Sequence, residues 1–321
     1  MRPIRIAFSD FPGPAPKSWS GLEHLSETHS FQLTDFDSAD LLIYSDFGER
    51  HWGFKGLKIY LTGENMLPDF DQCDLAFTPH ETPGEPRAIR FPYYAQVLPA
   101  LGSLVRQNGK PSCHQARRAK FCSFVASNPR GPERNMFFRK LNRRSHIDSA
   151  GRHFNNTGTQ LHDKRAFLLN YRMNLAFENS QSPGYITEKL VEPLLAGCIP
   201  IYWGAPDVAR DFNPRCLINV SDFPDFDAAI EYILAIDRDE SARQAMLDEP
   251  AFLDNRQPDC LKPSFIADPI AKLIDSGIGP GRRSYRHRRL REHAYDSSFD
   301  QTIVSLRCRL DGLAWKLGMR R

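Results

Sequence analysis

Short apolar runs separated by polar turns fill the first third of the chain. Each run is three to five residues long and is flanked by turn-forming residues, a pattern typical of strands covered on both faces of a parallel sheet. The runs lie at residues 4–8, 40–44, 57–61, 75–77 and 88–91. We therefore predict a first parallel sheet in this part of the chain.

Strands alternate with helices in the second half. Residues 98–119 are polar and basic without a clear period, and we interpret them as the connection between two domains. The pattern then predicts strands at 121–126, 172–177, 199–203 and 217–220 and helices at 133–142, 187–196 and 227–235. Such alternation is typical of βαβ units. The sequence thus predicts an α/β protein of two doubly wound domains, with a ligand crevice at the carboxyl ends of the strands.

The composition is that of a folded protein, with 41% hydrophobic and 25% charged residues. The chain opens directly on a strand-like run instead of a signal peptide. No apolar stretch approaches the roughly 20 residues that span a bilayer. The seven cysteines show no C-x-x-C spacing and are expected to be reduced. We therefore expect the body of the protein to be cytoplasmic.

Basic residues gather in a C-terminal tail, residues 280–321. Eleven Lys and Arg stand against four Asp and Glu there, although the whole chain carries only +3. An apolar stripe at helical spacing follows Ile303, Leu306, Leu310, Leu313 and Leu317. Basic amphipathic helices bind anionic membrane surfaces, so we expect peripheral membrane association through residues 302–321, with packing on the first domain or a dimer contact as alternatives. The tail contains no nucleic-acid-binding motif, and we expect no nucleic-acid partner.

The helix predicted at 187–196 begins where a phosphate group could bind. Thr187 is a suitable N-cap, and a helix start after a strand offers free N–H groups and a positive dipole end to an anion. Lys189 adds a full charge, and Glu188 adds an acceptor suited to sugar hydroxyls. An ordinary surface helix with one salt-bridging Lys is the alternative. Pro193 inside the helix predicts a kink or an irregular first turn.

Several separated motifs resemble those of one enzyme family. In chain order they are YLTGEN (60–65), FVASN (124–128) followed by Arg134-Asn135, FENS (177–180), YITEKL (185–190) and IPIYWG (199–204). The first resembles the acceptor-side motif, and the others the donor-side motifs, of the α-1,3-fucosyltransferases of glycosyltransferase family 10. Motifs in this order across roughly residues 58–225 are hard to obtain by chance.

The resemblance implies two Rossmann-like domains facing a central cleft, the GT-B arrangement. An acceptor-side domain would cover residues 1–115, completed by a helix at about 265–300, and a GDP-fucose-binding domain would cover residues 116–264. The implied reaction is inverting transfer of L-fucose from GDP-fucose to the 3-hydroxyl of GlcNAc in an N-acetyllactosamine-type acceptor. Its product would be of the Lewis-antigen type. The carrier stays open among lipopolysaccharide, a free oligosaccharide and another glycan.

The resemblance also assigns catalytic and donor-binding roles. Glu64, just past a predicted strand, is expected to be the general base. Arg134 and Lys189 are expected to stabilise the charge on the departing GDP. Glu188 is expected to stabilise the oxocarbenium-like sugar or to hold a hydroxyl. The other expected donor-site residues are Tyr185 (with a core position as the alternative), Asn179 (with loop capping as the alternative), Glu178, Ser127 and Asn128.

No metal site is predicted. The D-x-D spacing of metal-dependent glycosyltransferases occurs at residues 35–37, 69–71, 225–227 and 237–239. So short a pattern found four times indicates chance. Because the donor site already has two cations, we expect that no cofactor is required and that a divalent ion is at most stimulatory.

Two other functions stay open. A GT-B glycosyltransferase that uses a different GDP-sugar would share the phosphate site and differ where the sugar is recognised. A catalytically silent, membrane-associated sugar-binding protein is the second alternative. The presence of both Glu64 and Lys189 is evidence against it.

Overall fold

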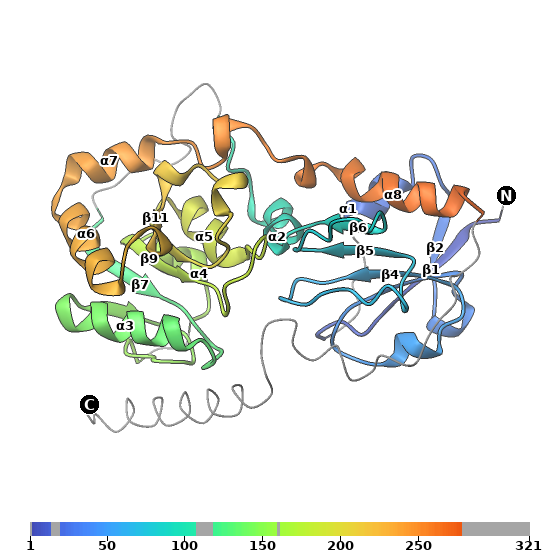
Figure 1. The fold of residues 1–321 in the computed structure, drawn as a ribbon, viewed down its shortest axis with the longest axis horizontal. Coiled ribbons are helices and arrows are strands. Elements are labelled where there is room, and N and C mark those ends of the chain that lie inside the picture. Colours follow the sequence, from blue (N-terminus) through green and yellow to red (C-terminus); the bar gives the residue numbers. More distant parts are fainter. Residues whose placement is uncertain (1, 14–19, 107–117, 159–160, 278–321) are drawn as a thin grey trace. The chain divides into compact units, whose positions relative to one another are not determined.

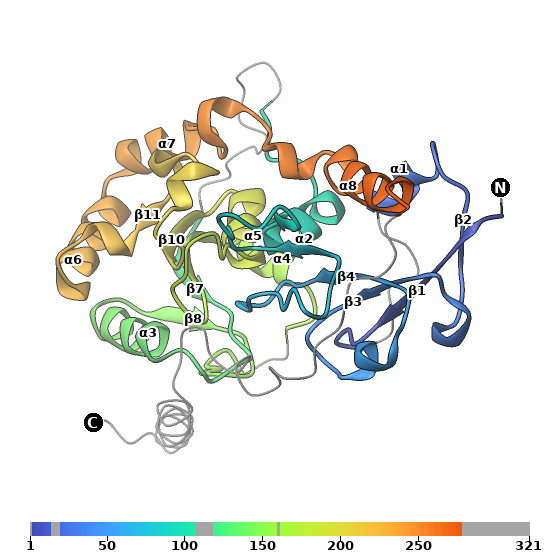
Figure 2. The same ribbon diagram turned by 45° about the vertical axis from the view of Figure 1, so that its right-hand side comes forward.

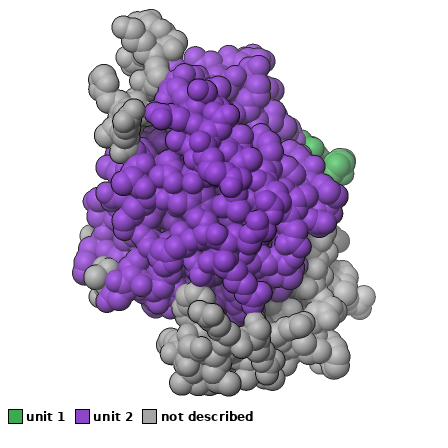
Figure 3. Space-filling view, turned by 90° about the vertical axis from the view of Figure 1, so that its left-hand side faces the viewer, with its two compact units in different colours: residues 1–96, 258–295 green, residues 97–257, 296–321 purple. Residues whose placement is uncertain are grey.

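The computed structural model describes residues 2–13, 20–106, 118–158 and 161–277. Among these, unit 1 comprises the residues up to Gln96 together with those from Pro258 onward, and unit 2 runs from Val97 to Gln257. Figure 3 shows one face of unit 2, in purple. The domain boundary expected between residues 115 and 116 and the basic tail at 280–321 lie outside the described residues.

Unit 1 is built on a six-stranded parallel sheet. Its strands are β1 (Ile4–Ser9), β2 (Phe31–Leu33), β3 (Leu41–Tyr44), β4 (Leu57–Leu61), β5 (Leu75–Thr78) and β6 (Ala88–Arg90). Their order is β2-β1-β3-β4-β5-β6, and every neighbouring pair is parallel. The inner strands β3 and β5 are buried along their whole length. This burial agrees with the continuous apolar runs from which they were predicted.

Two helices far apart in the sequence pack together in unit 1. They are α1 (Ser20–Leu25) and α8 (Pro263–Asp275), side by side in both ribbon views (Figures 1 and 2). Gly21 permits the approach, because a Cβ there would lie 2.4 Å from Cγ2 of Ile266. Helix α2 (Tyr93–Leu101) follows β6, and the chain leaves unit 1 within it. The segment after Pro258 therefore returns to unit 1.

Unit 2 contains a five-stranded parallel sheet in the order β11-β10-β9-β7-β8. The strands are β7 (Lys120–Phe124), β8 (Ile147–Ser149), β9 (Tyr171–Phe177), β10 (Ile199–Trp203) and β11 (Ile218–Asn219). The helices are α3 (Pro132–Arg144), α4 (Lys164–Leu168), α5 (Glu188–Ala196), α6 (Phe226–Arg238) and α7 (Glu240–Asp248). None of the described helices, in either unit, is both long and apolar enough to cross a membrane.

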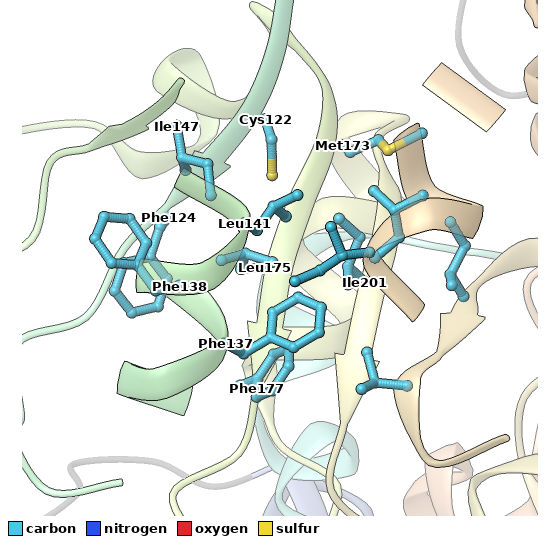
Figure 4. Close-up of a cluster of buried hydrophobic side chains, with 14 of the residues drawn as sticks. Cys122, Phe124, Phe137, Phe138, Leu141, Ile147, Met173, Leu175, Phe177 and Ile201 are labelled. Carbon is cyan, nitrogen blue, oxygen red and sulfur yellow. The ribbon is translucent and has the colours of Figure 1, made fainter. Parts of the chain in front are cut away.

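The main core of unit 2 joins its sheet to helices α3 and α6 (Figure 4). Alternate residues of β9 and β10 enter this core, as the two-residue period of a strand requires. The labelled members are Cys122, Phe124, Phe137, Phe138, Leu141, Ile147, Met173, Leu175, Phe177 and Ile201. A separate small cluster holds Leu168 of α4, Ala196 of α5 and Cys198. The helices thus form two distinct packing groups, as in a doubly wound domain.

Both sheets share one strand order. In each unit the first strand is internal, with the second strand on one side and the third on the other, which is the flavodoxin-like order. Ligands bind such sheets at the carboxyl ends of the strands, where the order reverses. These positions are between β1 and β3 in unit 1 and between β7 and β9 in unit 2.

The pattern of the sequence missed two short strands, β2 and β8. β2 and β8 each have three residues with a polar residue at the centre, too short for a period to be recognised. The strand predicted at 217–220 was too long, because only Ile218–Asn219 is strand. The Asn219 side chain accepts a hydrogen bond from the backbone N–H of Ser221, and the chain turns there into a 3₁₀ helix.

Candidate functional site

Arg134 joins the carboxyl ends of the two strands at the reversal point of unit 2. Its guanidinium donates to Oδ1 of Asn179 at 2.7 Å and to the backbone oxygen of Asn128 at 2.6 Å, and also to the backbone oxygen of Arg130. Asn128 follows β7, and Asn179 follows β9. Only 2% of Arg134 is exposed. Gly131, with a φ of 128°, permits the turn that leads into α3, where a side chain would be strained. The cation is therefore held in place by the segment between β7 and α3.

Glu178 is the first residue after β9 and is completely buried. Its carboxylate accepts two hydrogen bonds from Thr187, at 2.8 Å from the backbone N–H and at 2.7 Å from the hydroxyl. Its own backbone N–H donates to the oxygen of Trp203 at 2.8 Å. Gly204 leaves room for it, because a Cβ there would lie 2.5 Å from Cγ of Glu178. A residue this enclosed contacts other protein groups and not solvent.

Lys189 lies in the first turn of α5 with three acceptors around its ammonium. Nζ is 3.0 Å from the Thr187 hydroxyl oxygen, 3.3 Å from Glu178 Oε2 and 3.3 Å from Glu188 Oε1. The side chains of Lys189 and Glu188 are 20% and 29% exposed. Glu188 is thus the partner on the accessible side.

The three charged groups shift one another's pKa. Burial raises the pKa of Glu178 above its usual value, against the opposing effect of the Lys189 charge. Burial works to lower the pKa of Lys189, but the charges of Glu178 and Glu188 outweigh it and raise that pKa. Burial works to raise the pKa of Glu188, but the charges of Lys189 and Lys164 outweigh it and lower that pKa. The Arg134 charge also acts to lower the pKa of Lys189, and the two cations bind the adjacent residues Asn179 and Glu178.

Helix α5 begins and ends as its sequence predicts. The Thr187 hydroxyl accepts from the Lys189 backbone N–H, which is the expected N-cap. Gly197 ends the helix with a φ of 69°, in the left-handed conformation that glycine adopts easily. The helix continues through Pro193 without interruption, and its first turn begins with a regular cap. The irregular first turn considered for this proline is therefore not found.

The remaining predicted donor-site residues differ in exposure. Tyr185 is only 3% exposed, which is the packed position named as its alternative. Ser127 and Asn128 are exposed in the loop after β7, and Asn128 Oδ1 accepts from the Arg130 N–H at 2.9 Å. All of the predicted donor-side residues lie in unit 2, and those from the ends of β7, β9 and the start of α5 come together around the two cations.

Glu64 lies in unit 1, in the exposed turn after β4. Its backbone N–H donates to the Thr62 hydroxyl oxygen at 3.0 Å. The hydroxyls of Thr62 and Tyr60 in turn donate to the two carboxylate oxygens of Asp46, which follows β3. Burial, reinforced by the Asp46 charge, raises the pKa of Tyr60 well above its usual value. The turn that carries Glu64 is thus tied to the end of the neighbouring strand.

Sequence reasoning missed two of these contacts. The first is the pair of hydrogen bonds that Thr187 donates to Glu178. The second is the pair of hydrogen bonds that Asp46 accepts from the hydroxyls of Tyr60 and Thr62. The local signal is an acidic residue within two positions of the end of a buried strand, and Asp46 and Glu178 both show it.

The D-x-D aspartates of unit 2 have structural roles. Asp225 and Asp239 cap α6 and α7, Asp237 pairs with Arg172 at 2.7 Å, and Asp227 pairs with Lys140 at 2.6 Å. Within the described residues no group of three or more His, Cys, Asp or Glu is arranged to hold a metal ion. The expectation of a metal-independent reaction stays a prediction.

Comparison with known proteins identifies the family. Residues 114–247 match the family model described as glycosyltransferase family 10 (fucosyltransferase) C-term, and residues 6–97 match that of the alpha-(1,3)-fucosyltransferase FucT N-terminal domain. The alpha-(1,3)-fucosyltransferase FucT of Helicobacter pylori is 35% identical over 222 residues, which are 60% of this chain and 46% of that protein. A putative fucosyltransferase of Acanthamoeba polyphaga mimivirus is 28% identical over 69% of this chain and 36% of its own length. This chain therefore spans less than half the length of these curated relatives.

Solved structures resemble the fold over a larger share of this chain than the curated relatives match in sequence. A crystal structure of alpha1,3-fucosyltransferase with GDP-fucose superposes with a TM-score of 0.74 at 27% identity, over 88% of this chain and 93% of that one. A crystal structure with GDP gives a TM-score of 0.71. The two parallel α/β units are those of the GT-B class. Because the two family models together match more than half of its residues, the chain belongs to glycosyltransferase family 10, the fucosyltransferase family.

Proposed function

We propose that this chain is an inverting α-1,3-fucosyltransferase acting on GDP-fucose and an N-acetyllactosamine-type acceptor. The observation that carries the proposal is the pair of cations, Arg134 and Lys189, held beside the start of α5 at the reversal point of the unit 2 sheet. Helix starts and fixed cations are the groups that bind a diphosphate. The relatives described as α-1,3-fucosyltransferases and the neighbour solved with GDP-fucose support this donor.

The cations act on the leaving group. As the bond between the fucose anomeric carbon and the phosphate oxygen breaks, its electron pair passes to the β-phosphate of GDP. Arg134 and Lys189 stabilise this charge, and because both are already fixed by hydrogen bonds, little rearrangement is needed during the reaction. Glu188, ionised beside Lys189, stabilises the positive charge that develops on the sugar ring or holds one of its hydroxyls.

Glu64 acts on the acceptor. The 3-hydroxyl oxygen of GlcNAc attacks the anomeric carbon from the face opposite the leaving GDP, and its proton passes to the Glu64 carboxylate. The configuration is therefore inverted, and neither step requires a cofactor. A divalent ion would at most stimulate the reaction through the diphosphate. Membrane association through residues 302–321 is a separate proposal, which concerns residues outside those described.

The test is release of GDP from GDP-fucose in the presence of EDTA, with and without N-acetyllactosamine. We expect release that depends on the acceptor and persists without divalent ions. The matched control measures GDP release when another GDP-sugar replaces GDP-fucose as the donor. GDP binding without release from GDP-fucose, but with release from another GDP-sugar, would contradict the choice of fucose.

The role of Glu64 has its own test. Glu64→Gln keeps the size of the side chain and removes its basicity, so we expect turnover to fall ~100-fold or more. Affinity for GDP-fucose should stay near that of the wild type, because the predicted donor site lies in unit 2. Steady-state kinetics together with calorimetry measure both quantities. An unchanged turnover would remove Glu64 from the role of base.

A further inference from the structure

The donor site contains a carboxylate that cannot reach a ligand. Glu178 is completely buried, and its two oxygens face Thr187 and Lys189. A negative charge beside the place of a diphosphate would oppose binding if it acted alone. Its contribution must therefore pass through the groups that it contacts.

The hydrogen-bonding capacity of Lys189 indicates what Glu178 does. An ammonium has three N–H donors, and three acceptors lie within 3.3 Å of Nζ: the Thr187 hydroxyl, Glu178 and Glu188. Thr187 and Glu178 are buried, whereas the Glu188 side chain is 29% exposed. Two partners are thus fixed inside the protein, and the third lies on the side that solvent reaches.

We propose that Glu178 is a positioning residue that holds Lys189 and the start of α5 in place for the diphosphate of the donor, with Glu188 as the partner that the diphosphate displaces. The inference rests on the proposed function, since it assumes a nucleotide diphosphate at this site. Glu178 acts on Lys189 through its charge and on the helix through its two hydrogen bonds from Thr187. Displacement would free the Glu188 carboxylate for the sugar.

The chain offers a matched control in an ion pair at the other end of β9. At the other end of β9, Arg172 pairs with Asp237, whose side chain is 15% exposed, at 2.7 Å. Asp237→Asn removes a carboxylate from a comparable ion pair in the same unit, away from the cations of the donor site. Any general effect of losing such a pair will appear in this variant as well.

The experiment measures GDP affinity by calorimetry in a double-mutant cycle. We expect Glu178→Gln to weaken GDP binding ~10-fold and Asp237→Asn to leave it within ~2-fold. In a Lys189→Met background, adding Glu178→Gln should weaken GDP binding by clearly less than ~10-fold, because the cation is gone and only the hydrogen bonds from Thr187 are left to disturb. The double variant should also melt at a higher temperature than Lys189→Met alone, which leaves a buried carboxylate without its cation.

A second pair of variants covers the case in which Glu178→Gln does not fold. Thr187→Val removes the hydroxyl between Glu178 and Lys189 and should weaken GDP binding, and Thr187→Ser should regain part of the loss. The inference is overturned by Glu178→Gln or Thr187→Val binding GDP as tightly as the wild type. It is also overturned if Glu178→Gln weakens binding equally with and without Lys189. Failure of the wild-type protein to bind GDP would instead refute the proposed donor.

Discussion

Glu64 and Glu178 are both acidic residues that follow a buried strand, yet their surroundings differ. Glu64 is exposed in its turn, whereas Glu178 is enclosed and accepts every hydrogen bond that Thr187 can offer it. The first can take a proton from an acceptor sugar, and the second can act only on its neighbours. The motifs that contain them do not reveal this difference, because burial depends on which strands lie beside them.

Asp46 is expected to matter for turnover through the turn that carries Glu64. It accepts from the hydroxyl of Thr62, which in turn accepts from the Glu64 backbone N–H. Asp46→Asn should loosen this turn, lowering turnover ~10-fold while GDP affinity stays unchanged. The control is Asp74→Asn, since Asp74 bonds the Lys58 N–H at the opposite end of β4. Kinetics measure turnover and calorimetry measures GDP affinity. Equal turnover in both variants would contradict the role of Asp46.

At the scale of elements, the sequence predicts what is local and misses what depends on neighbouring strands. Helix α5 could be predicted from its N-cap Thr187 and the stop at Gly197, and β4 and β10 from short apolar runs. The contact between Glu178 and Thr187 could not, since it requires the chain to return past the end of β9. The order of the strands, which brings the ends of β7 and β9 together at Arg134, is likewise invisible in the pattern.

The turn after β10 supports the buried carboxylate. A Cβ on Gly204 would lie 2.5 Å from Glu178 Cγ and 2.5 Å from the Tyr202 hydroxyl. Gly204→Ala should therefore lower the free energy of unfolding by ~1–3 kcal/mol and weaken GDP binding, because Glu178 has to move. Gly53→Ala, with nothing within 4 Å of the added atom, is the control. Denaturant unfolding and calorimetry measure both effects, and a Gly204→Ala protein indistinguishable from the control would contradict this packing.

At the scale of the whole molecule, acid stability depends on the pair that joins β1 to β3. Arg5 donates to Asp40 at 2.8 and 3.0 Å, and this bond holds the pKa of Asp40 at about 2, below its usual value of 3.8. A carboxylate with a lowered folded-state pKa stabilises the fold above its usual pKa and loses that contribution as the pH falls through the folded value. Partial exposure reduces the contribution to roughly 1 kcal/mol.

Asp40→Asn should accordingly be less stable than the wild type at pH 6, and the difference should shrink between about pH 4 and pH 2. Denaturant titrations at a series of pH values measure the free energy of unfolding of both proteins. A difference that stays constant across this range would show that the Asp40 charge does not contribute. Activity at neutral pH should be retained, because the pair lies at the amino ends of the strands.

The most direct test of the account is the structure of the product formed from GDP-fucose and N-acetyllactosamine, determined by NMR. We predict one product, with fucose in α linkage to the 3-hydroxyl of GlcNAc, as inversion at the β-linked anomeric carbon of the donor requires. A β-linked product would contradict the inverting mechanism, and fucose at another hydroxyl would contradict the proposed specificity. GDP release without any fucosylated product would contradict the transferase function.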